Sequence, residues 1–256
     1  MKKYIPPLLV WAAFLGVWQA VTSAGLVSPI LLPSPLDTAR YLAGAALDGL
    51  LAEALLVTLR RLLTGFAIGL AGGMALGVLI HASPLARQTL GLAALGLQTL
   101  PSVCWAPLAI LWFGQSEAAM YFVVVMGTVW ALALSVKNAL ENTPPIYIRA
   151  ARVMGASGRH IWTGVILPAA LPQMLGGAKL GWAFAWRSLM AAEIYVVIIE
   201  RFGLGQLLHF GRELNAMDQV LGVMLVIVLV GVLTDRCVFR PAEKYFQNTR
   251  GLTKKE

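Results

Sequence analysis

The sequence predicts an all-α integral membrane protein that crosses the bilayer about six times. Hydrophobic residues make up 59% of its 256 residues, whereas soluble domains usually contain about 45–50%. Charged residues make up only 12%, and long stretches of the chain carry none. These stretches do not alternate between apolar and polar residues, as the strands of a membrane barrel would, so helices are expected.

The composition also excludes other classes of protein. A chain this apolar cannot remain disordered in water. Two cysteines rule out a disulfide scaffold. The net charge of +8 could suggest nucleic acid, but basic binding proteins spread their charge along a solvated face. We therefore expect the lipid bilayer, and not nucleic acid, to surround the chain.

Six spans are predicted from the gaps between charged residues. A spanning helix needs about 20 mostly apolar residues. The gaps supply such segments at about 8–24, 62–80, 89–113, 118–136, 180–199 and 218–239.

The first span needs to be distinguished from a cleaved signal peptide. Lys2 and Lys3 precede its apolar run, as in a signal peptide. The run is longer than a usual signal core, however, and contains Trp11 and Trp18. We expect a retained N-terminal anchor helix at 8–24.

Orientation follows from the distribution of Lys and Arg between the loops. With the N-terminus inside, 14 of these residues fall on the inner side and 5 on the outer side, while Arg187 lies within a span. Both termini, including a tail at 241–256, are therefore predicted to be cytoplasmic. Arg60 and Arg61 run against this bias, at the outer start of the second span.

The whole chain, 1–256, is expected to form a single membrane domain, with an external segment at 25–57 and core helices at 58–240. Prolines at the start of the external segment block helix formation. Asp37 is then predicted to be the N-cap of a helix lying at the membrane surface.

The second span carries glycines at intervals of four residues. Gly65, Gly69, Gly73 and Gly77 fall on one helix face and allow a neighbouring helix to approach closely. This pattern predicts a multi-helix bundle but says nothing about a ligand.

The third span contains Pro101 and Pro107 and is therefore predicted to be kinked or broken. Broken helices at membrane depth are tolerated where their backbone lines a cavity. Gln98, Ser102 and Trp105 are spaced to share one helix face. They are either part of the packed core or a polar stripe facing a translocation path.

The fifth span contains two charged residues, Arg187 and Glu193. A charge at the centre of a bilayer costs about 2.5–3.5 kcal/mol on insertion scales, so each residue should face protein or water. They lie about 120° apart around the helix and need separate partners. Arg187 either makes a buried ion pair or carbonyl bond, or attracts an anion into a cavity. Glu193 is expected to be a structural partner or part of an outer gate, and both are candidates for the path.

The longest internal loop, 137–179, is polar and basic, and Glu141 is the one acidic residue that opposes its cations. Two short helices are predicted in it, one starting at Pro145 and one reaching Pro168. Such an element is either a docking surface for a partner or a segment lying on anionic lipid. Its cations include Lys137, Arg149, Arg152 and Arg159.

Nothing in the sequence indicates an enzyme. There is no G-x-x-x-x-G-K-[ST] motif for a nucleotide, and His81, His160 and His209 lack metal-ligand spacing. An ion-gradient-driven transporter would need intramembrane carboxylates and often an internal repeat, and Glu193 alone qualifies. A channel-like protein would not need the 137–179 loop. These two classes remain as alternatives to a transporter subunit served by a partner.

A resemblance to a known family is carried by residues 149–168, which read RAARVMGASGRHIWTGVILP. This segment resembles the loop signature of permease subunits of ATP-binding cassette importers, which is E-A-A, three residues, Gly, nine residues and I-x-L-P. Ala150, Ala151 and Gly155 match, and Pro168 ends the motif at the correct spacing. Arg149 takes the place of the acidic residue, and a valine replaces the isoleucine.

Further segments resemble the branch that serves nitrate, bicarbonate, taurine and alkanesulfonates. They are LLPSP at 31–35, LPSVCWAPLAILWFG at 100–114, WRSLMAAE at 186–193, GLGQLL at 203–208 and VLTDR at 232–236. The resemblance implies a type I importer permease for a small anion in the bacterial inner membrane.

The resemblance also implies partners. It predicts a second copy of the chain, two cytoplasmic ATPase subunits that bind ATP and Mg, and a periplasmic or extracellular substrate-binding protein. The chain itself would hold no cofactor. The 149–168 segment would form the coupling helix, with contacts to the ATPase from Arg149, Ala150, Ala151, Met154, Gly155, Ala156 and Arg159.

Overall fold

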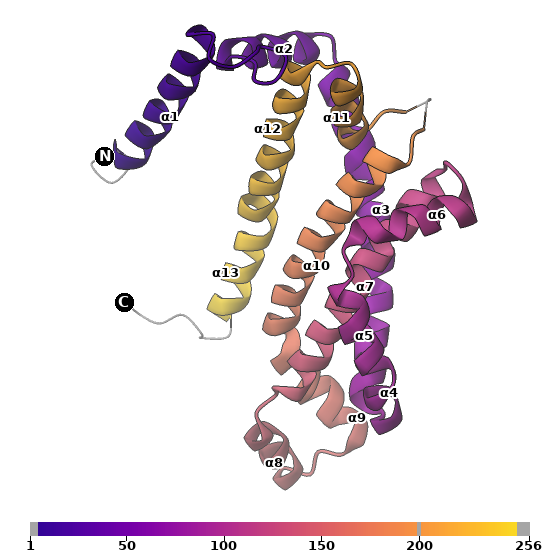
Figure 1. Ribbon diagram of the computed structural model, residues 1–256. Helices are drawn as coiled ribbons and strands as arrows, with labels where there is room; N and C mark the ends of the chain where they lie inside the picture. Colours follow the sequence, from indigo (N-terminus) through magenta and orange to yellow (C-terminus); the bar gives the residue numbers. More distant parts are fainter. Residues whose placement is uncertain (1–4, 199–200, 250–256) are drawn as a thin grey trace. The chain divides into compact units, whose positions relative to one another are not determined.

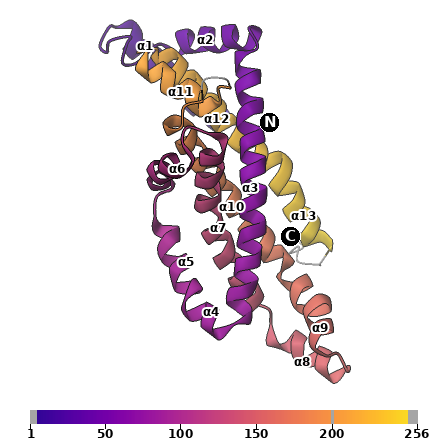
Figure 2. The same ribbon diagram turned by 90° about the vertical axis from the view of Figure 1, so that its right-hand side faces the viewer.

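The computed structural model describes residues 5–198 and 201–249, and every regular element within them is a helix (Figures 1 and 2). This confirms the predicted all-α class. The elements are α1 (Ile5–Ser23), α2 (Pro35–Leu47), α3 (Leu50–Ala82), α4 (Pro84–Gln88), α5 (Leu90–Thr99), the 3₁₀ turn η1 (Ser102–Cys104), α6 (Trp105–Phe113), α7 (Glu117–Glu141), α8 (Pro145–Val153), α9 (Gly158–Ile161), the π turn η2 (Trp162–Ile166), α10 (Leu167–Tyr195), α11 (Leu204–Glu213), α12 (Met217–Thr234), the π turn η3 (Asp235–Phe239) and α13 (Arg240–Thr249).

The described residues contain four helical runs that are long and apolar enough to span a membrane. These are Leu50–Ala82, Glu117–Glu141, Gly158–Tyr195 and Met217–Phe246. A fifth candidate is the pair Pro84–Thr99 and Ser102–Phe113, which is bent by 99° at the break between them. The predicted first span is found as α1, whose apolar part Leu9–Ser23 is shorter than the others. The count is therefore four or five by length, against the six predicted.

Two span boundaries differ from the prediction. Helix α3 begins at Leu50, well before residue 62, so Arg61 lies inside it. The helix predicted to end at Pro168 instead continues from Gly158 to Tyr195. Pro168 is the second residue after the π turn η2, in the first turn of α10, and Pro172 lies within α10 without ending it. Membrane helices tolerate such prolines because neighbouring groups and local π adjustments satisfy the freed carbonyls. The predicted loop 137–179 is correspondingly shorter.

The chain divides into two compact units, which are described separately. One comprises 1–59 and 197–230, and the other 60–196 and 231–256. In the first, Ser34 is the N-cap of α2: its Oγ accepts a hydrogen bond from the Asp37 amide at 3.1 Å and donates one to Asp37 Oδ2 at 2.7 Å. The prediction that Asp37 is the N-cap was wrong, because Ser34 caps the helix from three residues earlier. The Ser34 hydroxyl lowers the pKa of the Asp37 carboxyl.

Helix α11 is capped within the same unit by a residue of α3. Thr58 Oγ1 accepts a hydrogen bond from the Leu204 amide at 2.8 Å, and the buried Gln206 accepts one from the Gly203 amide at 3.0 Å. Glycine at the N-cap offers no side-chain acceptor, and these two residues instead accept from the amides of the N-cap and of the first helical residue.

The second unit is built around α7, which packs against α3 along the predicted glycine face. A Cβ atom on Gly65 would lie 2.7 Å from Val124, and one on Gly73 would lie 2.6 Å from Leu132. These distances leave no room for a side chain. The predicted close packing is confirmed, and its partner is α7.

Helix α10 packs antiparallel on α7 through a second pair of glycines. Gly177 lies against Ser135 and Gly181 against Leu132, where added Cβ atoms would be 2.6 and 2.7 Å away. Helices α3, α7 and α10 run side by side in both views (Figures 1 and 2). The spacing of four between these glycines is the same small-residue packing signal as in α3, and it was not predicted.

Helix α13 continues α12 through the π turn and is tied to α10 by ion pairs. Lys179 Nζ lies 2.7 Å from Asp235 and 3.2 Å from Glu243. Part of the predicted tail 241–256 is therefore helical, and residues 250–256 of it lie outside the described residues.

Candidate functional site

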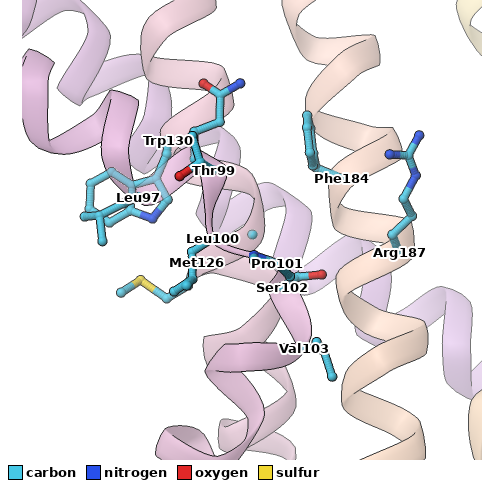
Figure 3. A pocket seen from close by; sticks show the side chains of 12 residues that line it. Leu97, Thr99, Leu100, Pro101, Ser102, Val103, Met126, Trp130, Phe184 and Arg187 are labelled. Atoms are coloured by element: carbon cyan, nitrogen blue, oxygen red, sulfur yellow. The ribbon is translucent and has the colours of Figure 1, made fainter.

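A cavity of about 300 Å³, called the central cavity below, lies where the broken third span meets α7 and α10 (Figure 3). Three chain segments line it. The residues are Leu97, Gln98, Thr99, Leu100, Pro101, Ser102 and Val103 of the break, Met126, Gly127 and Trp130 of α7, and Phe184 and Arg187 of α10.

The break that opens this cavity is explained by Pro101. The proline ring disfavours helical geometry at the preceding residue, and Leu100 has the extended angles φ −71° and ψ 123°. Helix α5 therefore ends at Thr99, and the chain resumes in η1 after the 99° bend. Pro107 causes no break because it lies in the first turn of α6, where backbone N–H groups need no intrahelical acceptor.

The structure brings three of the five path candidates together. Gln98, Ser102 and Arg187 all line the central cavity. Trp105 does not: it is buried, with its ring centroid 6.2 Å from that of Phe122. The prediction that Gln98, Ser102 and Trp105 share one helix face was wrong, because the chain bends between the first and the other two.

Arg187 has a side chain that nothing in the described part of the chain neutralises. Its guanidinium carbon lies 5.7 Å from the ring centroid of Phe184, a cation–π contact worth about 0.5–1 kcal/mol at an exposed site. It makes neither an ion pair nor a hydrogen bond with residues 5–198 or 201–249. The structural interpretation of Arg187, a buried pair or a carbonyl bond, is thus absent among them. Arg187 is among the residues that line the cavity, and its planar donors can bind an oxyanion in two-pronged fashion.

Two further buried donors have no hydrogen-bond partner among the described residues. They are Nε1 of Trp130, which lines the cavity, and Oγ of Ser188, which does not line it but lies next to the lining residue Gly127. Ser188 packs against Gly127, where an added Cβ atom would overlap its hydroxyl and lie 3.4 Å from Ser102. Gly127 therefore lets α7, α10 and η1 meet at this wall.

Glu193 belongs to a different site, a buried ion cluster formed with Arg61 and Glu117. Arg61 Nη1 donates to Glu193 at 3.0 Å, and its Nη2 and Nε donate to Glu117 at 2.7 and 3.0 Å. The side chains of Arg61 and Glu193 are fully buried. This cluster joins α3, α7 and α10 at the end of the unit where α7 begins.

Arg61 was not among the site residues predicted from the sequence, because it was placed outside the membrane at the start of the second span. The sequence nevertheless contained a reason to expect such a residue, because Glu193 lies in a predicted span and needs a cation from another helix. Arg61 lies next to a span and was already inconsistent with the charge bias.

At the other end of α7, helices α8 and α9 form a compact turn, which we call the α8–α9 element (residues 145–161). Helix α8 ends in a Schellman motif: the Ala156 amide donates to the Ala151 carbonyl at 2.9 Å and the Gly155 amide to Arg152 at 3.0 Å. Gly155 has φ +84°, a conformation that L side chains rarely adopt. The glycine of the sequence motif is therefore required by the backbone angle.

One face of α8 is anchored and the other is exposed. Ala151 is buried in a hydrophobic cluster with Val136, Ala139, Leu140, Ile161, Ile166, Ala170 and Met174, from α7, α9, η2 and α10. On the outer face, Val153 and Met154 are 89% and 80% exposed, and Ile146 and Tyr147 are also exposed. An apolar face this exposed marks an interaction site.

Four of the seven coupling candidates line a second cavity, of about 580 Å³, between α8 and η2. They are Ala151, Met154, Gly155 and Ala156. Arg149, Ala150 and Arg159 are exposed outside it. No group of three metal-ligating side chains occurs within the described ranges.

Comparison with known proteins assigns the chain to a family. Residues 67–238 match the family described as binding-protein-dependent transport system inner membrane component. A putative ABC transporter permease of Methanocaldococcus jannaschii is 29% identical, over 96% of this chain and 92% of the relative. The taurine transport system permease of Escherichia coli is 30% identical, over 88% and 82%, and the nitrate import permease of Synechocystis is 25% identical, over 92% and 87%.

The fold is similar to a chain in an inward-facing structure of the MetNI methionine ABC transporter. The TM-score is 0.62 at 21% identity, covering 82% of this chain and 99% of the other. This similarity confirms the predicted type I importer fold. The chain therefore belongs to the binding-protein-dependent transport system inner membrane components, and is a multi-pass permease subunit of an ABC importer whose ATPase activity lies in partner subunits.

Proposed function

We propose that this permease forms half of an import path for a small anion and that a second copy supplies the other half. The observation that carries the proposal is Arg187, a cation at a membrane cavity with no countercharge among the described residues. The relatives named for aliphatic sulfonates, taurine and nitrate support the same charge class. Sulfonate or taurine, nitrate and bicarbonate are the candidate substrates. A two-fold pair is the commonest way to complete such a path.

The α8–α9 element is proposed to couple the path to ATP hydrolysis. Its exposed apolar face would enter a groove on a cytoplasmic ATPase, where ATP and Mg are bound, and the hollow beside Gly155 would receive an ATPase side chain. Arg149 and Arg159 would face acidic ATPase groups or lipid headgroups. Because Ala151 belongs to a hydrophobic cluster that includes Ala170 and Met174 of α10, a displacement of α8 would be passed to the helix that carries Arg187.

The proposed orientation places the α8–α9 element and both termini in the cytoplasm. The buried ion cluster then lies toward the outer side, where a substrate-binding protein would deliver the anion. A reporter fused to the C-terminus should be cytoplasmic, and one inserted at Gly44 should be external. A periplasmic C-terminal reporter would contradict this orientation.

The anion path is tested by Arg187→Met. The variant complex should assemble and hydrolyse ATP, yet take up substrate poorly, because the cavity loses its cation. Arg60→Met removes an exposed arginine from the same unit and serves as the control. Normal ATP-driven uptake by a well-folded Arg187→Met protein would refute the path.

Coupling is tested by Gly155→Leu, with Gly176→Leu as the matched control. Neither added side chain meets an atom within 4 Å of its Cβ, but only Gly155 has a positive φ. A side chain in that conformation costs about 1–2 kcal/mol and would also project into the docking face. Copurification of the ATPase and uptake should be lost in the first variant and kept in the second. Retained copurification with Gly155→Leu would count against docking at this turn.

A further inference from the structure

The α8–α9 element is followed directly by Trp162, a half-buried residue that opens the π turn η2. Trp162 packs against the hydrophobic cluster that holds Ala151 and Ile161 of the element. Its ring also meets that of His81, near the end of α3, with the ring centroids 5.5 Å apart and the planes at 81°. An aromatic contact therefore joins the element to the end of α3.

This contact depends on the two rings rather than on a hydrogen bond. The Nδ1 atom of His81 is buried and has no hydrogen-bond partner within residues 5–198 and 201–249. Edge-to-face aromatic pairs contribute free energy beyond the area that they bury. Phenylalanine in place of His81 should therefore keep the contact, and alanine should remove it. The π turn that Trp162 opens is a rare conformation, found frequently at functional sites.

The end of α3 is in turn packed against α5. Ile80, the neighbour of His81, is fully buried in a cluster with Ala94 of α5, and Trp130 packs against the same cluster. Arg87, in the short helix α4 that leads into α5, donates a hydrogen bond to the His81 carbonyl at 3.2 Å. Close-packed protein interiors are barely compressible and transmit displacements. A displacement of His81 is therefore passed to α5.

Helix α5 carries part of the wall of the central cavity. Leu97 and Thr99, near its end, line the cavity, and Phe184 and Arg187 line it from α10 (Figure 3). The hydrophobic cluster beside α8 contains residues of α10 and so connects the element to the α10 wall. The contact between Trp162 and His81 connects the same element to the α5 wall by a separate route.

From this arrangement we infer that Trp162 and His81 are positioning residues for transport, which pass a movement of the α8–α9 element to α5 and thereby change the width of the central cavity. The inference rests on the proposed function, in which this element docks on the ATPase. It adds a second route, to the wall that α10 does not form. Neither residue lines the cavity, so both act on the path through α5.

The test follows the two walls separately. Thr99→Cys reports on α5 and Phe184→Cys on α10, each in a background of Cys104→Ser and Cys237→Ser, since both native cysteines are exposed. The permease–ATPase complex is reconstituted in nanodiscs. The rate at which N-ethylmaleimide alkylates each reporter is measured without nucleotide and after trapping with ATP and vanadate, and the ATP-induced change in rate is the readout.

Trp162→Ala and His81→Ala should each reduce the ATP-induced change at the α5 reporter by about two- to tenfold, the change in an equilibrium that corresponds to one aromatic pair. The α10 reporter should respond as before, and the ATPase should still copurify. The double variant should be no worse than either single one, because both remove the same contact. Trp162→Leu makes the same prediction should Trp162→Ala fail to assemble.

Trp162→Phe and His81→Phe keep an aromatic pair and should retain the response of the α5 reporter. Trp182→Ala is the matched control. This half-buried tryptophan of α10 also makes an edge-to-face contact, with Phe66 at 5.1 Å, but it lies outside the route to α5. Its removal should leave the response of the α5 reporter unchanged.

An unchanged response of the α5 reporter in both alanine variants, with the α10 reporter still responding to ATP, would overturn the inference and leave the proposed function standing. An equal loss at both reporters would also overturn it, since the two residues would then only support the structure. Absence of any ATP response at either reporter, in the complex with Trp162 and His81 intact, would contradict the proposed coupling itself and the inference with it.

Discussion

Arg61→Met should destabilise the permease strongly, because it leaves two carboxylates without their shared cation. The Arg61–Glu193 contact at 3.0 Å corresponds to about 5 kcal/mol of attraction at an effective dielectric constant of about 20. Much of this attraction offsets the cost of taking both charges out of water. Removing one partner of a buried pair is nevertheless costly, typically about 3–5 kcal/mol, since the charge left behind keeps its desolvation penalty.

The assay is thermal unfolding of the purified protein in detergent. For a chain of this size, 1 kcal/mol corresponds to a shift of about 2–4 °C, so Arg61→Met should lower the unfolding temperature by about 6–20 °C. Arg60→Met is the matched control, because this neighbouring arginine is exposed, and it should leave the temperature nearly unchanged.

A double variant tests the cause. Adding Glu193→Gln to Arg61→Met removes one uncompensated buried charge and should restore part of the lost stability. Glu193→Gln alone should cost less than Arg61→Met, because Glu117 still neutralises the guanidinium. Unfolding of Arg61→Met at the same temperature as Arg60→Met would refute the reasoning.

Two matched pairs test packing in the same unit. Gly73→Ala should lower the unfolding temperature by an amount equivalent to about 1–3 kcal/mol, since its Cβ atom would lie 2.6 Å from Leu132. The Cβ atom of Gly72→Ala would meet nothing closer than 3.5 Å, so this control should leave the unfolding temperature unchanged. Equal effects of the two variants would contradict tight packing between α3 and α7. Ala151→Leu should reduce thermal stability because Ala151 is buried, whereas Ala150→Leu, on the exposed face, should preserve stability and weaken ATPase copurification. If Ala150→Leu lowered thermal stability and Ala151→Leu weakened ATPase copurification instead, α8 would present its other face to the partner.

Local patterns in the sequence predicted much of this fold. The apolar gaps located the long helices, and the glycine spacing predicted the close face of α3. The start of α3 was predicted too late because every charge was treated as the edge of a span. Arg61 breaks that rule, since a charge neutralised inside the protein does not have to lie outside the membrane.

The central cavity was predictable only in part. Pro101 indicated a break, but the helical spacing of Gln98, Ser102 and Trp105 assumes that no break exists. These two inferences conflict, and the proline prevails because its ring excludes helical geometry at Leu100. Gln98 and Ser102 still reach the same cavity, through the bent chain, while Trp105 turns into the packing around Phe122.

The two charges of α10 show most directly what the sequence leaves open. By hydropathy alone, Arg187 and Glu193 each carry the free-energy cost of a charge inside the membrane, and both therefore need a partner. Glu193 finds its partner 132 residues away, on α3, a helix that also packs on α7 and on α10. Such a pairing depends on tertiary structure and has no local signature. Arg187 has no such partner among the described residues, so its neutralising charge has to come from outside them. That difference, produced by the fold, is why Arg187 is the residue assigned to the anion.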